Sequence, residues 1–201
     1  KKALGVSEIC VLGLETEEVC LEVDGGASGM TWQPLFHIDV FLNLGGTGSD
    51  GKELVFFGNP AKCQEVLEGS SDANIAMSEI EDRAIPMFKE VQDQLDIQNF
   101  RTVDIPIYFC NGIVFSWNNC LVEVSSEIRR VYLPSYQTDA DHEQLNSTFR
   151  MLESSVANIY DEYGFEVVWF RHGRFFRTMA EHGGNLHCIV KVMRRGKYKS
   201  S

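Results

Sequence analysis

The stretch Tyr163-Gly164-Phe165-Glu166-Val167-Val168-Trp169-Phe170 predicts the junction of a helix and a strand. Before it, apolar residues recur at helical spacing from Asp139 to Tyr163, and Gly164 is a residue type that commonly ends a helix. The run from Phe165 to Phe170 is rich in β-branched and aromatic side chains, as strands are. A long helix that leads directly into a strand indicates a mixed α/β chain.

The same alternation occurs again toward the N-terminus. An amphipathic helix is predicted from Asn74 to Leu95, with a kink at Pro86. Between the two helices, Asn118-Asn119 interrupts a long strand-like text. The strands expected in this part of the chain are Arg101 to Tyr108, Gly112 to Trp117, Cys120 to Val124 and Arg130 to Leu133.

The first half of the chain predicts a hairpin. Its strands are Phe36 to Leu42 and Glu53 to Phe57, because the glycine-rich segment from Gly45 to Gly51 supplies the conformations that a tight reversal needs. We also expect an opening strand from Ile9 to Leu12 and a final strand from Leu186 to Met193. Strand pairs that alternate with helices predict α/β repeats of strand-strand-helix-strand type within one domain spanning residues 1–201.

Composition narrows the class of protein. The chain has 44% apolar and 23% charged residues, as globular domains do, and its apolar runs are strand-sized, too short to cross a bilayer. A formal charge of −11 argues against nucleic acid and anionic membranes as partners and favours cationic or neutral ligands. The first residues lack the apolar core of a secretory signal, which favours a cytoplasmic chain over a secreted one whose signal has been removed.

The six cysteines are widely spread and contain no Cys-x-x-Cys pair. We therefore expect reduced thiols rather than a disulfide framework or a cysteine-rich metal site. Cys110 and Cys120 lie in apolar, strand-like text, which is typical of inert core thiols.

Cys188 stands in a different context, the run Gly183-Gly184-Asn185-Leu186-His187-Cys188. The glycines permit close approach of the backbone to a ligand, and a cysteine just after such a turn is accessible. By itself this text also fits a core cysteine at the start of a buried strand.

A second polar motif is His37-Ile38-Asp39. On a strand, His37 and Asp39 point to the same face, and the intervening Ile38 points to the core. An imidazole beside a carboxylate suits a catalytic or cation-binding cleft, although an ordinary half-exposed strand has the same pattern.

Together the two motifs resemble the guanidino-group modifying enzymes, or penteins. This superfamily includes arginine, agmatine and peptidylarginine deiminases, dimethylarginine hydrolases and amidinotransferases. The resemblance lies in the order His-x-Asp first and Gly-Gly-Asn-x-His-Cys last, about 150 residues apart, and covers roughly residues 20 to 195. It implies a pentein-like α/β propeller of repeated modules, incomplete at the N-terminus.

The resemblance also implies a chemistry without a metal or cofactor. Cys188 would attack the guanidinium carbon of arginine, an arginine derivative or a peptidyl arginine, and form a covalent thiouronium. His37 would transfer protons, and Asp39 would hold the cationic substrate. The match to the family's further carboxylate is Asp24, in Asp24-Gly25-Gly26, and Asn185 is a third expected substrate-binding residue.

Several alternatives stay open at this point. An amidinotransferase uses the same nucleophile with an amine in place of water, and a non-catalytic binding protein would keep the fold only. A cysteine protease is disfavoured because a triad acid lies behind the imidazole, not beside it on one strand face. A zinc site at His182, His187 and Cys188 lacks a fourth ligand nearby. Further residues that could line a pocket are Glu22, Asn111, Trp117, Asn118 and Asn119.

Overall fold

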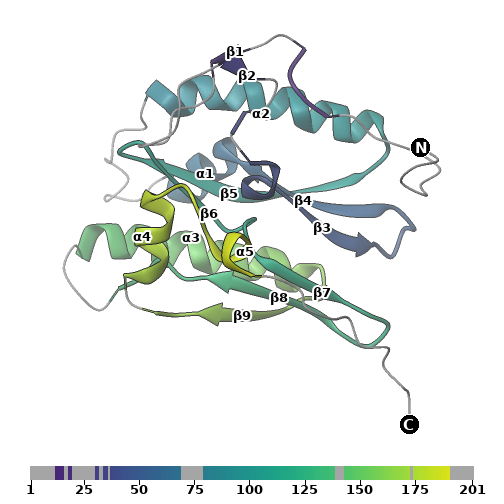
Figure 1. Ribbon diagram of the computed structural model, residues 1–201. Helices are drawn as coiled ribbons and strands as arrows, with labels where there is room; N and C mark the ends of the chain where they lie inside the picture. The colour runs from purple at the N-terminus through teal and green to yellow at the C-terminus, as the bar shows by residue number, and fades with distance from the viewer. Residues whose placement is uncertain are drawn as a thin grey trace.

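Two units with the same chain order form the centre of the structure, a computed structural model (Figure 1). In each unit a hairpin is followed by helical chain, and the next strand then returns parallel to the hairpin's second strand. The described residues are 12–15, 18–19, 30–31, 34–35, 37–68, 79–138, 143–172 and 174–190. Of the opening strand predicted from Ile9 to Leu12, only Leu12 is among them. Asp24 and Glu22 also lie outside the described residues.

The first unit forms most of a four-stranded sheet in the order β3-β4-β5-β6. β3 and β4 are the predicted hairpin, β5 lies parallel to β4, and β6 pairs antiparallel with β5. Its elements are β3 (Leu42–Thr47), β4 (Glu53–Asn59), α1 (Pro60–Leu67), α2 (Glu79–Ile97), β5 (Arg101–Cys110) and β6 (Ile113–Ser116).

The second unit forms a three-stranded sheet in the order β7-β8-β9. Its helix α3 is the long amphipathic helix that the sequence predicts. Its elements are β7 (Leu121–Val124), β8 (Arg129–Pro134), α3 (Glu143–Glu162) and β9 (Glu166–Phe170). The mixed α/β class is therefore confirmed.

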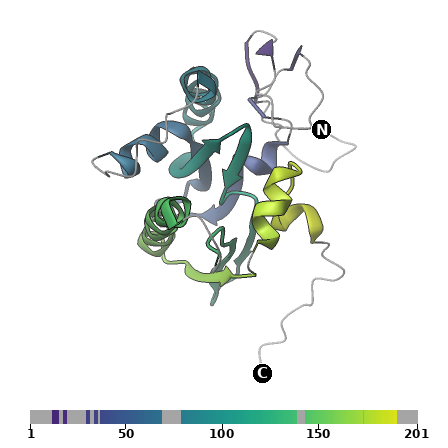
Figure 2. The same cartoon turned by 90° about the vertical axis from the view of Figure 1, so that its left-hand side faces the viewer.

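The two sheets meet along β3 and β7 and curl into a half-barrel (Figure 1). Turning the molecule shows α3 on one side of the strands and the C-terminal helices α4 (Phe175–Glu181) and α5 (Leu186–Ile189) on the other (Figure 2). The remaining elements are the short pair β1 (Glu18–Val19) and β2 (Met30–Thr31) and a 3-10 turn, η2 (Ile38–Val40).

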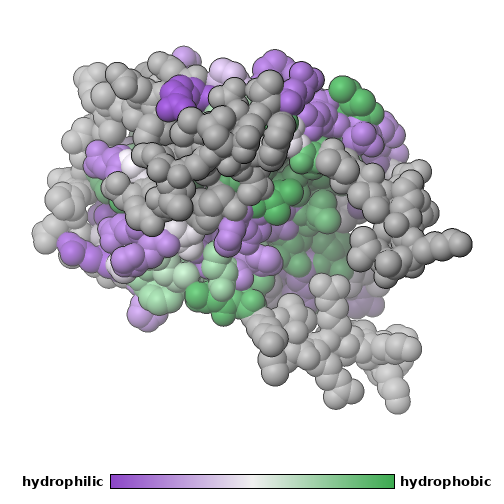
Figure 3. Space-filling model, turned by 45° about the horizontal axis from the view of Figure 1, so that its top comes forward, coloured by the Kyte–Doolittle hydropathy of each residue, from purple (hydrophilic) through white to green (hydrophobic). Residues whose placement is uncertain are grey.

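Alternation along β4 explains how the first sheet is buried on both faces. Leu54 and Phe56 enter one core, which α3 and β9 complete, and Val55 and Phe57 enter a second core beneath α2. Strands covered on both faces are apolar without a break, as this one is. On the face drawn in Figure 3, apolar side chains reach the surface in an area right of centre, with hydrophilic side chains to its left.

Two predictions of secondary structure are wrong, and one helix was missed. The strand expected from Phe36 to Leu42 begins only at Leu42, and α1 was not predicted. The final strand expected from Leu186 to Met193 begins instead as the helix α5, and residues beyond Val190 lie outside the described part. Among the described residues, no helix has the length and apolarity that a membrane span requires.

Candidate functional site

His37 and Asp39 lie on a 3-10 turn rather than on a strand. His37 is extended, and the turn that follows carries Asp39 back toward it, so that His37 Nδ1 and Asp39 Oδ1 are 3.8 Å apart. Two carbonyl groups of this segment accept hydrogen bonds from distant side chains, and the Phe41 carbonyl also accepts the Gly58 backbone N–H at 2.7 Å. Ser116 Oγ donates to Val40 O, and Asn118 Nδ2 donates to Phe41 O at 2.7 Å.

The turn also changes which side chains are buried. Strand alternation places both Ile38 and Val40 in the core, but Ile38 is 49% exposed while Val40 is buried. The juxtaposition of imidazole and carboxylate that the sequence predicts is nevertheless present, because the turn brings residues i and i+2 to one side.

Cys188 lies on the short helix α5, whose start is fixed by its own sequence. Gly183 has a φ of 71°, a conformation that glycine adopts readily. Asn185 then caps the helix, since its Oδ1 accepts the Leu186 N–H at 2.9 Å. This cap replaces the predicted strand and presents His187 and Cys188 on the exposed side of the helix.

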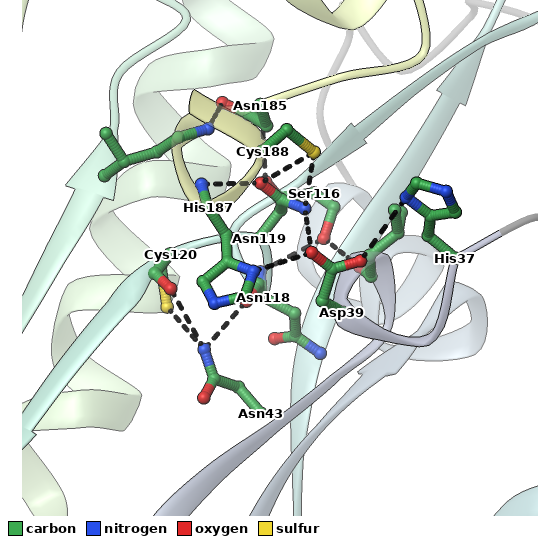
Figure 4. Close-up of polar contacts among 12 residues, drawn as sticks. His37, Asp39, Asn43, Ser116, Asn118, Asn119, Cys120, Asn185, His187 and Cys188 are labelled. Carbon is green, nitrogen blue, oxygen red and sulfur yellow. Dashed lines mark hydrogen bonds and ion pairs between the residues drawn. The ribbon is translucent and has the colours of Figure 1, made fainter. Parts of the chain in front are cut away.

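Asn119 joins the two halves of the site (Figure 4). Its Nδ2 donates to Asp39 Oδ2 at 3.1 Å and lies 3.5 Å from Cys188 Sγ. Its Oδ1 accepts the His187 backbone N–H at 2.9 Å. Asn119 is only 1% exposed, so its amide bridges Asp39 and Cys188 from a buried position beneath them.

His187 also contacts Asp39, which the sequence did not predict. Its Nδ1 lies 2.8 Å from Asp39 Oδ2, and the imidazole is 52% exposed. The carboxylate of Asp39 therefore lies between two imidazoles, His37 on one oxygen and His187 on the other. A carboxylate with only 27% side-chain exposure and two exposed imidazole partners is suited to exchanging these imidazoles for a cationic ligand.

Cys188 is the one exposed thiol among the four cysteines of the described ranges; the others are Cys63, Cys110 and Cys120. Burial raises the pKa of Cys120 to about 12, so this thiol is inert at physiological pH. The prediction that Cys110 and Cys120 are core thiols is confirmed.

The connector from β6 to β7 supplies the support beneath the site. Its four residues, Trp117 to Cys120, are all buried, which is unusual for a chain reversal, and so is Ser116 at the end of β6. Asn118 bonds the carbonyls of Phe41 and Phe56, and Asn43 Nδ2 donates to Asn118 O and Cys120 O. Polar residues inside the apolar text from Val114 to Val122 are the sequence signal for this role.

The structure brings together Asp39 and Cys188, adds Asn119 and His187, and leaves His37 at the edge, 61% exposed. Asn185 is buried, and its side chain points to Ser116 and Tyr136 beneath the site. Asp24 lies outside the described residues. In the ranges that the structure describes, no three His, Cys, Asp or Glu side chains are grouped to hold a metal ion.

No protein-family model matches the chain, and no curated protein matches it significantly.

Proposed function

We propose that the protein is a cysteine-dependent hydrolase that acts on the guanidinium group of arginine or an arginine derivative. The observation that carries this proposal is the bridge formed by Asn119 between the Asp39 carboxylate and the Cys188 thiol. A carboxylate for a planar cation and an exposed thiol beside it, held by one rigid amide, are the two groups that the reaction needs.

The guanidinium is bound by Asp39. Its carboxylate offers two oxygens to the parallel N–H groups of the substrate, and such paired, charge-assisted bonds are among the strong ones in proteins. His187 occupies Oδ2 in the structure, and its exposed ring can leave when the substrate arrives. The strongly acidic chain favours approach of a cation.

The first step forms a bond between Cys188 Sγ and the guanidinium carbon. As the tetrahedral adduct collapses, one C–N bond breaks, and His37 supplies the proton with which the nitrogen leaves as ammonia or an amine. The Nδ2 group of Asn119 lies 3.5 Å from the sulfur. A thiouronium ester on Cys188 remains.

The second step returns the enzyme to its starting state. Water gives a proton to His37 and attacks the same carbon, and the C–S bond then breaks to release a ureido product and the thiolate. An amine in the place of this water would give a new guanidine, which is the amidinotransferase reaction.

The proposal extends to the fold, a pentein-like propeller built of strand-strand-helix-strand modules. It is supported by the two units with identical strand order and direction. An experimental structure of the protein tests it: strand-strand-helix-strand modules arranged around a common axis are expected, and units packed in another arrangement contradict it.

Incubation with arginine, agmatine, dimethylarginine and an arginine peptide tests the activity. We expect ureido product and ammonia or amine from at least one of them, and none from Cys188→Ala. Cys63→Ala is the matched control, since Cys63 is a buried thiol of the core. Adding glycine as an acceptor identifies a transferase by its guanidine product. Equal turnover by Cys188→Ala would rule out the nucleophile, and binding without turnover by the unmodified protein would make it a binding protein.

A further inference from the structure

Tyr136 lies directly behind the site and is held on all sides. Its ring is fully buried, with centroids 5.1 Å from Phe115, 5.3 Å from Trp117 and 5.5 Å from Phe149. Its backbone is fixed as well, because its N–H donates to Glu153 Oε1 at 2.7 Å and its carbonyl accepts from Arg177 Nε. The hydroxyl at the end of this ring therefore has a defined position.

The hydroxyl of Tyr136 makes three hydrogen bonds. It donates to Ser116 O at 2.7 Å and accepts the Ser116 N–H at 3.2 Å and the Asn185 side-chain amide. A phenol has one proton and two lone pairs, so its capacity is filled. Burial raises the pKa of Tyr136, which keeps the hydroxyl neutral and able to donate.

Each partner leads to a different half of the site. Asn185 caps α5, the helix that carries His187 and Cys188. Ser116 Oγ donates to Val40 O in η2, the turn that carries Asp39, and accepts the Asn118 N–H at 3.0 Å, one residue before Asn119. Figure 4 shows Ser116 and Asn185 near the thiol and the carboxylate that they support.

We infer that Tyr136 is a positioning residue whose hydroxyl sets the distance between the Cys188 thiol and the Asp39 carboxylate. It does so by tying η2 and α5 to one buried point. The effect on turnover rests on the proposed function, whereas the effect on the environment of Cys188 rests on the hydrogen bonds alone.

Tyr136→Phe removes the hydroxyl and keeps the ring. Asn185 Nδ2 then keeps only Ser116 O at 3.5 Å, and a buried donor left in this way drives its segment to rearrange. A shift of about 1 Å in a reacting group costs roughly 100-fold in rate, so kcat should fall by about 10- to 100-fold while KM changes little.

The matched control is Tyr160→Phe. Tyr160 is also fully buried among aromatic rings, and burial likewise raises its pKa, but its hydroxyl contacts Cys120 Sγ at 3.8 Å instead of the site. Both variants lose one buried hydroxyl, so their difference isolates the connection to η2 and α5.

The experiment follows Cys188 in two ways. Chloroacetamide, which is neutral, labels the thiol over a pH series, and the pH of the half-maximal rate reports its surroundings. Chloroacetamidine, which is cationic, needs both the thiol and Asp39. For Tyr136→Phe we expect the pH profile of chloroacetamide labelling to be displaced. We also expect the ratio of chloroacetamidine to chloroacetamide labelling to fall about 10-fold, because a reacting group would move by about 1 Å. Tyr160→Phe should match the unmodified protein.

The outcomes separate the two claims. If Tyr136→Phe matches Tyr160→Phe in both labelling and turnover, the positioning role is wrong whatever the enzyme does. If no guanidino compound is turned over but the labelling of Tyr136→Phe still changes, the proposed function fails and the positioning role stands. If Tyr136→Phe does not fold, Asn185→Asp takes its place. This substitution keeps the oxygen that caps α5 and removes the amide that donates to the Tyr136 hydroxyl. The positioning role then requires the pH profile and the labelling ratio of Asn185→Asp to change as described for Tyr136→Phe.

Discussion

At the scale of single residues, Asp39 has more than one role in the structure. Its Oδ2 contacts both Asn119 and His187, and its Oδ1 faces His37. The charge of this carboxylate, rather than its shape, is what a guanidinium requires, because an amide of the same size offers only one acceptor and no attraction for a cation.

Asp39→Asn should therefore remove the preference of Cys188 for cationic reagents. Charged hydrogen bonds are worth roughly 1.5–3 kcal/mol, so the ratio of chloroacetamidine to chloroacetamide labelling should fall about 10- to 100-fold. Labelling by the neutral reagent serves as the internal control, since it reports the thiol alone. A ratio that stays at the unmodified value contradicts the binding role of Asp39.

Glu153 predicts a pH-dependent stability. Burial raises its pKa above the ordinary 4.5, while hydrogen bonds from Tyr136, Gln137 and Ser135 act in the opposite direction. Above pH 4.5 the folded protein therefore binds more protons at Glu153 than the unfolded chain does. The stabilisation that Glu153 contributes is at its maximum below pH 4.5, and it is lost as the pH rises through the pKa of the folded state.

Glu153→Gln should abolish this decline. In urea unfolding, the free energy of unfolding of Glu153→Gln minus that of the unmodified protein should increase from pH 4.5 to pH 7. The same difference for Glu127→Gln, which replaces an exposed glutamate in a turn, is subtracted as the control. A relative stability that is constant over this range would contradict the prediction.

At the scale of elements, the caps of α1 and α5 form a natural pair. Asn59 caps α1 by accepting the Ala61 N–H, and Asn185 caps α5 by accepting the Leu186 N–H, both at 2.9 Å. Only the second helix carries residues of the site.

We expect Asn59→Ala and Asn185→Ala each to destabilise the protein by about 1 kcal/mol or more, the usual cost of a lost cap. Cys188 labelling by chloroacetamidine should fall in Asn185→Ala and stay unchanged in Asn59→Ala. Thermal unfolding gives the first quantity and reagent kinetics the second. Equal labelling in the two variants would show that α5 holds Cys188 without its cap.

At the scale of the whole molecule, Phe56 joins the two units. It lies on β4 of the first unit, and its ring centroid is 4.3 Å from Tyr160 of α3 and 5.3 Å from Phe165, just before β9. The side chain is fully buried in the core that both units share.

Phe56→Ala should reduce the free energy of unfolding by about 3–5 kcal/mol, the usual cost of removing a buried phenylalanine side chain. Ile97→Ala, at an 80% exposed position at the end of α2, should change it by less than about 0.5 kcal/mol. Chemical unfolding at equilibrium measures both. A small loss for Phe56→Ala would indicate that the units are stable without their shared core.

The sequence by itself determined the alternation of hairpins and helices, because apolar periodicity is a local property: β4, β5, α3 and β9 lie close to where the patterns predict them. It failed at η2 and α5, where local text resembled strands. At η2 a distant side chain, Ser116, binds the carbonyl of Val40, and at α5 the cap formed by Asn185 starts a helix; apolar periodicity encodes neither contact.

For the site, the sequence supplied His37, Asp39 and Cys188 as candidates, named Asn119 only as a residue that could line a pocket and considered His187 only as a zinc ligand. Only the tertiary structure decided which of them meet. Hydrogen bonds and ion pairs act over about 3 Å, and folding alone brings Asp39 within that distance of His187, from the other end of the chain, and of Asn119, from a buried connector between two sheets.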